Sequence, residues 1–118
     1  AENPSCPYKV AAIKRKHPRL QMIAAHFGGV WHWQYVVDAL KGLDIYMDTS
    51  SSLFAIPQEL LEGIFNSFPR KNFLFGSDYP LFDCNDEIEL LRRRLRLSDS
   101  EVEEILTNAN ALQLIREK

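Results

Sequence analysis

Cysteine is scarce in this sequence, and long apolar runs are missing from it. The two cysteines among the 118 residues, Cys6 and Cys84, lie far apart, and neither belongs to a CxxC motif. We expect both to be reduced thiols, because disulfide frameworks and zinc sites need several cysteines at characteristic spacings. No stretch reaches the roughly 18 apolar residues of a membrane span, and no basic segment followed by an apolar one opens the chain. The sequence therefore predicts no membrane partner, no signal peptide and a cytoplasmic location.

Common nucleotide-binding and catalytic motifs are missing as well. Neither G-x-G-x-x-G nor G-x-x-x-x-G-K-[ST] occurs, which argues against a dinucleotide-binding fold and against a P-loop. The run Gly76-Ser77-Asp78 has some likeness to a G-x-S-x-G nucleophile elbow, but Tyr79 stands where a glycine is needed. We therefore do not expect Ser77 to be a nucleophile. The net charge of -2 gives no reason to expect nucleic acid as a partner.

Apolar strands and amphipathic helices alternate along the chain. Short apolar runs predict strands over residues 20–25, 44–49 and 72–77, with Asp78 at the carboxyl end of the last one. Helical spacing predicts helices over residues 8–17, 33–42, 57–68, 85–95 and 98–106, and further helical turns over 109–115. Pro57 is expected at the first helical position, and Ser98 with Glu101 forms a capping-box pattern. This alternation predicts an α/β fold in which parallel strands are joined by helical crossovers.

A polar residue closes each predicted strand. Asp78 has two open interpretations, a metal ligand or general base and a carboxylate that caps the following segment. His26 is similarly either a metal ligand or proton carrier, or a structural histidine. Because the carboxyl ends of parallel strands share one edge of a sheet, the pair favours a functional site more than either residue does alone.

Two further positions carry weaker signals. Asp48 precedes Thr49 and three serines, so a hydrogen-bonded loop is its more common explanation and a catalytic role is the alternative. Trp31 lies two residues before Trp33, in a loop that enters a helix. Tryptophans at such positions usually pack against neighbouring elements, and the lining of a pocket mouth is the alternative.

Several segments together resemble one family. They are Ile23–Gly29, Ile45–Ser50, Leu74–Pro80, Leu97-Ser98, Ile105-Leu106 and Asn108-Ala109. The most specific feature is the Gly-Ser-Asp-Tyr-Pro run with a His-Phe-Gly-Gly motif about fifty residues earlier. In these motifs the chain resembles the C-terminal part of an amidohydrolase-related barrel, the branch that includes aminocarboxymuconate semialdehyde decarboxylase and related metal-dependent hydrolases.

The resemblance implies a TIM (β/α)8 barrel of which this chain forms strands 6 to 8. It places a divalent metal, zinc first and manganese or another ion next, on Asp78 and His26, and both residues would also carry the acid-base chemistry of a metal-activated water. Trp31 and Tyr79 are expected to contact a small substrate of carboxylate, amide or ester type. The activity implied is that of a metal-dependent hydrolase or decarboxylase, a carbon-carbon lyase.

The chain also departs from that family. The His-x-His pair of the first strand and the histidine of the fifth strand have no counterpart among the 118 residues, which are far fewer than the roughly 250 of a complete barrel. Residues 1–118 are therefore expected to form a partial barrel domain without its N-terminal strands, inactive alone, whose partner is the missing part or another copy of the chain. The alternative is a non-catalytic partial barrel that acts in assembly or regulation.

Overall fold

A parallel sheet forms the centre of the protein. The computed structural model describes residues 6–29, 31–77 and 83–108. Its strands are β1 (Ile23–Ala24), β2 (Tyr46–Asp48) and β3 (Phe73–Leu74). They lie side by side in the order β1-β2-β3 and are parallel, with Ala24 opposite Met47 and Asp48 opposite Leu74. The predicted α/β fold with parallel strands is therefore confirmed, although each strand is shorter than its apolar run.

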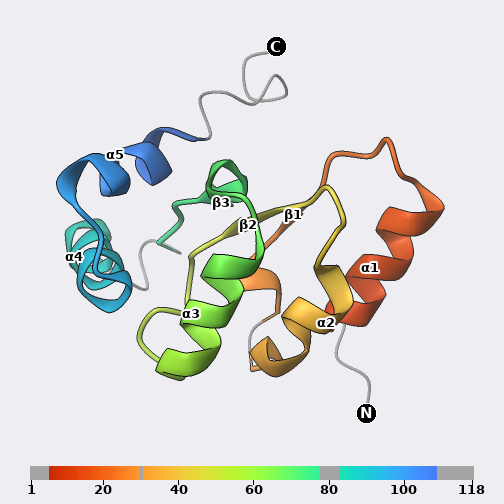
Figure 1. Ribbon diagram of the computed structural model, residues 1–118, viewed down its shortest axis with the longest axis horizontal. Helices are drawn as coiled ribbons and strands as arrows, with labels where there is room; N and C mark the ends of the chain where they lie inside the picture. Colours follow the sequence, from red (N-terminus) through yellow and green to blue (C-terminus); the bar gives the residue numbers. More distant parts are fainter. Residues whose placement is uncertain (1–5, 30, 78–82, 109–118) are drawn as a thin grey trace.

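Helices connect and flank the strands. They are α1 (Pro7–Lys16), α2 (Val36–Leu40), α3 (Gln58–Ser67), α4 (Cys84–Leu95) and α5 (Asp99–Thr107). Short 3-10 turns cover His26–Gly28, Trp33–Tyr35 and Arg70–Asn72. Figure 1 shows α1 and α2 at one side of the sheet, α3 in front of it, and α4 and α5 at the other side. None of the helices in the described part of the chain is long and apolar enough to cross a membrane.

The helix ends follow the local signals of the sequence with one correction. Ser98 caps α5 as predicted, since its Oγ accepts a hydrogen bond from the Glu101 N-H at 3.2 Å while Glu101 Oε1 accepts one from the Ser98 N-H at 2.8 Å. Pro57 is the N-cap of α3 and not its first helical residue, because its ψ of 145° is not helical. The predicted turns over 109–115 lie outside the described residues.

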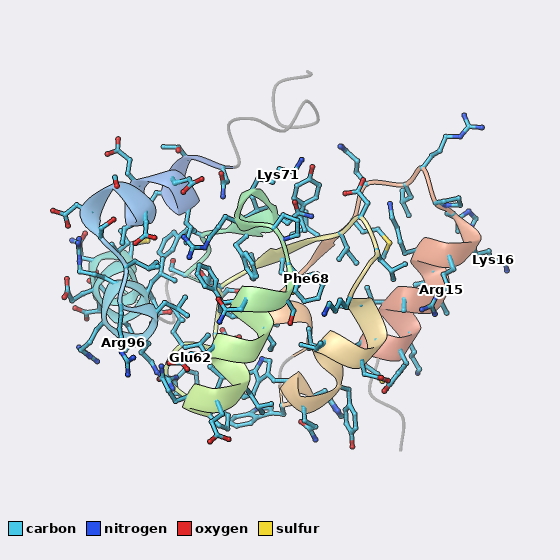
Figure 2. The ribbon with its side chains drawn as sticks, in the orientation of Figure 1. Arg15, Lys16, Glu62, Phe68, Lys71 and Arg96 are labelled. Carbon is cyan, nitrogen blue, oxygen red and sulfur yellow. The ribbon has the colours of Figure 1, made fainter. Side chains whose placement is uncertain are left out.

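The core lies between the sheet and the helices that cover it. The Phe73 ring on β3 stands 5.0 Å from the Phe65 ring on α3 and 5.9 Å from the Phe27 ring after β1, measured between centroids. Met47 on the central strand is fully buried. Charged side chains such as Arg15, Lys16 and Arg96 lie at the helix ends (Figure 2). Residues of β2 and β3 therefore form part of the hydrophobic core.

Two asparagine side chains join segments that are distant in the sequence. The Nδ2 of buried Asn72, just before β3, donates a hydrogen bond to the Ile45 carbonyl at 2.7 Å, just before β2. The Nδ2 of Asn108, at the end of α5, donates to the carbonyls of Arg70 and Phe73 at 3.0 and 2.9 Å. These bonds satisfy backbone acceptors that would otherwise have to find water. The last described helix is thereby joined to the last strand.

Candidate functional site

The carboxyl ends of the strands meet at one edge of the sheet. The backbone N-H of His26, two residues after β1, donates a hydrogen bond to Oδ1 of Asp48, the last residue of β2, at 3.0 Å. From β2 onward, Thr49 Oγ1 donates to the Gly76 carbonyl and accepts from the Gly76 N-H, each at 3.2 Å. Residues that follow different strands thus meet at this edge, as the parallel topology predicts.

The backbone after β1 turns sharply at His26. His26 and Phe27 have positive φ angles of 61° and 53°, and Gly28 follows at 96°. Left-handed backbone costs roughly 1 kcal/mol or more at residues other than glycine, so packing must hold this turn. The fully buried Phe27 ring and a hydrogen bond from Trp33 Nε1 to the His26 carbonyl at 3.0 Å do so. The turn carries the His26 ring toward the loop that follows β2.

Asp48 organises that loop. Its Oδ1 accepts hydrogen bonds from the Ser50 N-H at 3.0 Å and from the Ser50 hydroxyl at 2.6 Å, in addition to the bond from the His26 N-H. Hydrogen bonds to an ionised oxygen are stronger than neutral ones. The hydrogen-bonded loop that the sequence favoured for Asp48 is therefore present, and the loop includes the histidine backbone.

Ser50 is a residue of the site that the sequence did not single out. Its Oγ and its main-chain carbonyl oxygen each lie 2.9 Å from Nδ1 of His26. The Ser50 side chain is buried, and Ser52 Oγ donates to the Ser50 carbonyl at 2.9 Å. The serine run directly after Asp48 was the available signal, because hydroxyls beside a carboxylate commonly form such networks.

Of the remaining predicted site residues, only Trp31 lies within the described part of the chain. Trp31 is 64% exposed, and its ring stands 5.3 Å from that of buried Trp33, so Trp31 lies on the surface next to the turn. Asp78 and Tyr79 lie outside the described residues. The last described residue before them, Ser77, is buried, with its Oγ 3.1 Å from the Sγ of Cys84 at the start of α4.

The described residues do not by themselves make a metal centre. Over residues 6–29, 31–77 and 83–108, no group of three or more His, Cys, Asp and Glu side chains is placed to hold an ion. At the strand edge one imidazole, His26, lies next to one carboxylate, Asp48, and Oδ1 of that carboxylate already has three donors. Catalytic metal sites usually provide at least three protein ligands. A metal at this edge needs ligands from elsewhere.

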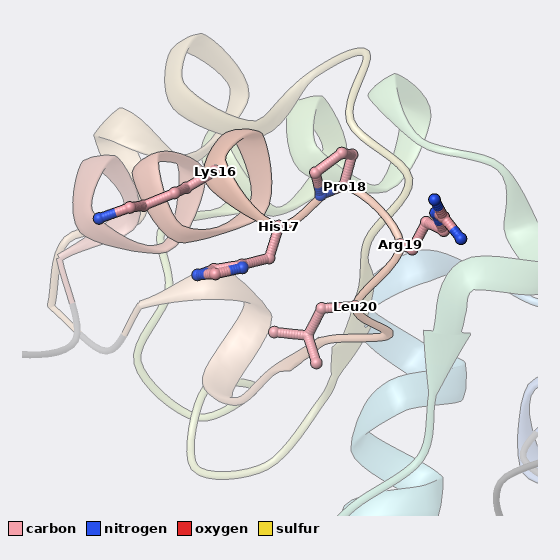
Figure 3. Close-up of a pocket in the computed structure, with 5 residues that line it drawn as sticks. All are labelled: Lys16, His17, Pro18, Arg19 and Leu20. Atoms are coloured by element: carbon pink, nitrogen blue, oxygen red, sulfur yellow. The ribbon is translucent and has the colours of Figure 1, made fainter.

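One cavity is lined by β1 and another by the segment that precedes it. A groove of about 260 Å³ runs along β1 and reaches the site, with Val10, Met22, His26 and Gly28 among its lining residues. A larger opening of about 690 Å³ is lined by Lys16, the last residue of α1, and by His17 to Leu20 in the loop that leads to β1 (Figure 3). That loop precedes β1 and so lies at the opposite edge from His26. The smaller groove, and not the larger opening, therefore lies next to the candidate site residue His26.

The protein belongs to the class of β/α proteins in which polar residues gather at the carboxyl ends of parallel strands. The sequence model of the amidohydrolase family matches residues 3–116. The chain therefore belongs to the amidohydrolase family, as its motifs predicted. No curated protein is similar enough in sequence to be identified as a relative.

Solved structures share the fold at low sequence identity. A zinc-bound amidohydrolase from Burkholderia multivorans is 18% identical with a TM-score of 0.67, over 89% of this chain and 47% of its own. A dihydroxybenzoic acid decarboxylase from a Polaromonas species, with manganese and the inhibitor 2-nitroresorcinol, is 17% identical with a TM-score of 0.62, over 92% and 38%. A probable 2-pyrone-4,6-dicarboxylic acid hydrolase from Acinetobacter baumannii is 17% identical with a TM-score of 0.64, over 95% and 50%. This chain thus spans half or less of their lengths.

Proposed function

We propose that the chain supplies strands 6 to 8 of a (β/α)8 barrel whose complete protein is a metal-dependent hydrolase or decarboxylase. The observation that carries this proposal is that His26, Asp48 and the Gly76 backbone meet at one edge of the sheet. Gly76 lies two residues before Asp78 in the sequence. Membership of the amidohydrolase family and coverage of 38 to 50% of the solved structures support it. The rest of the barrel, or a second copy of this chain, is the partner that the proposal requires.

In this proposal His26 and Asp78 are the catalytic and metal-contacting residues of the chain. His26 moves a proton between substrate and solvent, and Asp78, four residues after β3 in the sequence, contributes a carboxylate. Trp31 and Tyr79 flank the substrate. The substrate is a small carboxylate, amide or ester, a class that agrees with the dihydroxybenzoate and pyrone dicarboxylate named for the solved structures.

The proposed metal is a divalent cation, zinc or manganese, as bound in two of the solved structures. Its ligands besides His26 and Asp78 would come from strands outside this chain. Such an ion polarises a carbonyl and makes water more acidic. Removal of metal with a chelator from the complete protein should abolish turnover, and addition of zinc or manganese should restore it.

Asp78→Asn in the complete protein tests the proposal. Because asparagine keeps the shape of the side chain but removes its charge and basicity, we expect kcat to fall by more than about 100-fold while the protein stays folded. Circular dichroism and steady-state kinetics measure the two effects. Asp44→Asn, just before β2 at the opposite edge, is the matched control and should retain activity. Full activity of the Asp78 variant would refute the assignment.

A non-catalytic partial barrel is the second candidate. It is favoured by the incomplete set of metal ligands among the described residues. The amino-acid sequence of the complete protein, or of the chain that supplies the rest of the barrel, distinguishes the two candidates. A His-x-His pair after an apolar strand supports the enzyme, whereas its absence supports a role in assembly or regulation.

A further inference from the structure

We infer that Arg94, on α4, is a positioning residue of the candidate site. Its guanidinium holds the loop after β2, residues 49–57, in the conformation that places Ser50 against the His26 ring. The inference rests on the proposed function and deepens it, because it adds a residue that acts on the site through this loop. No motif in the sequence marks Arg94.

The loop after β2 depends on support from outside. Residues 49–57 belong to no helix or strand, and Ser51 among them has a positive φ of 52°. The side chain of Leu53 is fully buried, so the backbone polar groups beside it need partners within the protein. The Leu53 carbonyl accepts a hydrogen bond from Nη1 of Arg94 at 2.8 Å. The middle of the loop is therefore joined to α4.

The guanidinium of Arg94 is itself fixed by Gln58, the first residue of α3. Nε and Nη2 of Arg94 both donate to Oε1 of Gln58, at 3.2 and 2.9 Å. In return, Nε2 of Gln58 donates to the Arg94 carbonyl at 2.7 Å and to Oε2 of Glu62 at 2.8 Å. A planar guanidinium can direct several N-H groups at two partners at once, whereas a lysine ammonium is a single point charge. The arginine is thereby held between the start of α3 and the loop.

Both ends of α4 lie at the carboxyl side of the sheet. Cys84, its first residue, has its Sγ 3.1 Å from the Oγ of Ser77, which follows β3, and Arg94 near the other end bonds the loop after β2. The next helix, α5, reaches the start of β3, where Asn108 bonds the Phe73 carbonyl (Figure 1). Helix α4 is thus an additional helix beside the loops that follow the strands, and such loops carry the site in β/α barrels.

The consequence for the site follows from the contacts of Ser50. Its Oγ and its carbonyl oxygen each lie 2.9 Å from Nδ1 of His26, so a displaced loop displaces or releases the imidazole. A shift of about 1 Å in a reacting group can lower a rate about 100-fold. Because the loop supports a residue proposed to act in the reaction, we expect its displacement to change kcat more than KM.

Arg94→Lys in the complete protein tests the inference. The variant keeps the positive charge, but its ammonium cannot reproduce the bonds to both Leu53 and Gln58. We expect faster hydrogen exchange of the backbone amides over residues 49–57, measured by mass spectrometry, and a kcat about 10- to 100-fold lower with a smaller change in KM. Arg93→Lys, at an exposed position of the same helix, is the matched control and should change neither quantity.

Gln58→Ala is the second variant. It keeps the bond from Arg94 to Leu53 but removes the partner that fixes the guanidinium, so both changes should be smaller, and it decides the test if Arg94→Lys does not fold. Circular dichroism establishes folding. Unchanged kcat in the folded variant, or a lower kcat with unchanged exchange over residues 49–57, would overturn the inference. Asp78→Asn separates the two proposals: if it abolishes turnover while Arg94→Lys retains full kcat, only the inference fails.

Discussion

Gly28 and Gly42 both have positive φ angles, 96° and 90°, but their surroundings differ. A Cβ added at Gly28 would lie 3.0 and 3.1 Å from the two γ-carbons of Val36 and 3.3 Å from Leu40, whereas nothing lies within 4 Å of one added at Gly42. At Gly42 only the backbone conformation requires glycine. At Gly28 the packing of α2 against the turn after β1 requires it as well.

Gly28→Ala should therefore destabilise the protein more than Gly42→Ala. Backbone strain costs roughly 1 kcal/mol at each position, and overpacking adds about 1 to 3 kcal/mol at Gly28. Denaturant unfolding of the two variants measures the difference, and each is the control for the other. Equal losses would mean that Val36 and Leu40 move aside without cost.

The sequence predicted the positions of polar residues near the strand ends, whereas their roles stay predictions. His26 and Asp48 could be placed at one edge because parallel strands end together. The contact of Ser50 with His26 spans 24 positions and depends on left-handed backbone at His26 and Phe27. Residues other than glycine rarely adopt that conformation, so no local pattern predicts it. The roles of Asp78 and Tyr79 stay predictions, because both residues lie outside the described part of the chain.

Helix α4 contains a buried carboxylate, Glu87, with one oxygen that has no hydrogen-bond partner among the described residues. Glu87 is 3% exposed on the same helix face as buried Leu91, and its Oε1 has no hydrogen-bond partner among the described residues. Burial, with a smaller contribution from the charge of Asp86, raises the pKa of Glu87. The folded protein therefore binds a proton at Glu87 more tightly than the unfolded chain does.

This shift makes stability depend on pH. Because its pKa is raised in the folded state, Glu87 stabilises the folded protein when it is protonated. This contribution to the free energy of unfolding is complete below the ordinary glutamate pKa of about 4.3 and is lost as pH rises through the folded-state value. Glu87→Gln should remove that loss, so the variant gains stability over the parent between mildly acidic and neutral pH. Urea unfolding across this range measures it, with exposed Glu103→Gln as the control. A parallel pH profile for parent and Glu87→Gln would contradict the prediction.

Element order was also predictable, whereas strand length was not. The apolar run over 20–25 predicted a strand, yet only Ile23–Ala24 pairs with β2. A run of apolar residues indicates burial, but the length of a strand depends on the neighbour that it pairs with. Helix starts were better defined because caps such as Ser98 act locally.

At the scale of the whole molecule, β1 is an edge strand that pairs only with β2 among the described strands. Leu20 before it is 49% exposed and Ile23 within it 42% exposed. An open strand edge with apolar side chains favours pairing with another chain. In the proposed barrel, a further strand would cover this edge.

We therefore expect the 118-residue chain on its own to associate in dilute solution. Ile23→Lys should weaken this association, because it places a charge on the open edge. Light scattering measures the size of both proteins. Leu106→Lys, on the exposed side of α5, is the control and should associate like the parent. A monomeric parent would show that the β1 edge is adequately protected as it stands.

The two hydrogen bonds from Asn108 tie the stability of one region to that of another. The C-terminal end of α5 holds the carbonyls of Arg70 and Phe73, and β3 begins at Phe73. Local unfolding of α5 would free both acceptors and loosen the strand that leads to Asp78. We therefore expect helix and strand to unfold as one cooperative unit, so that their amide hydrogens exchange together with solvent.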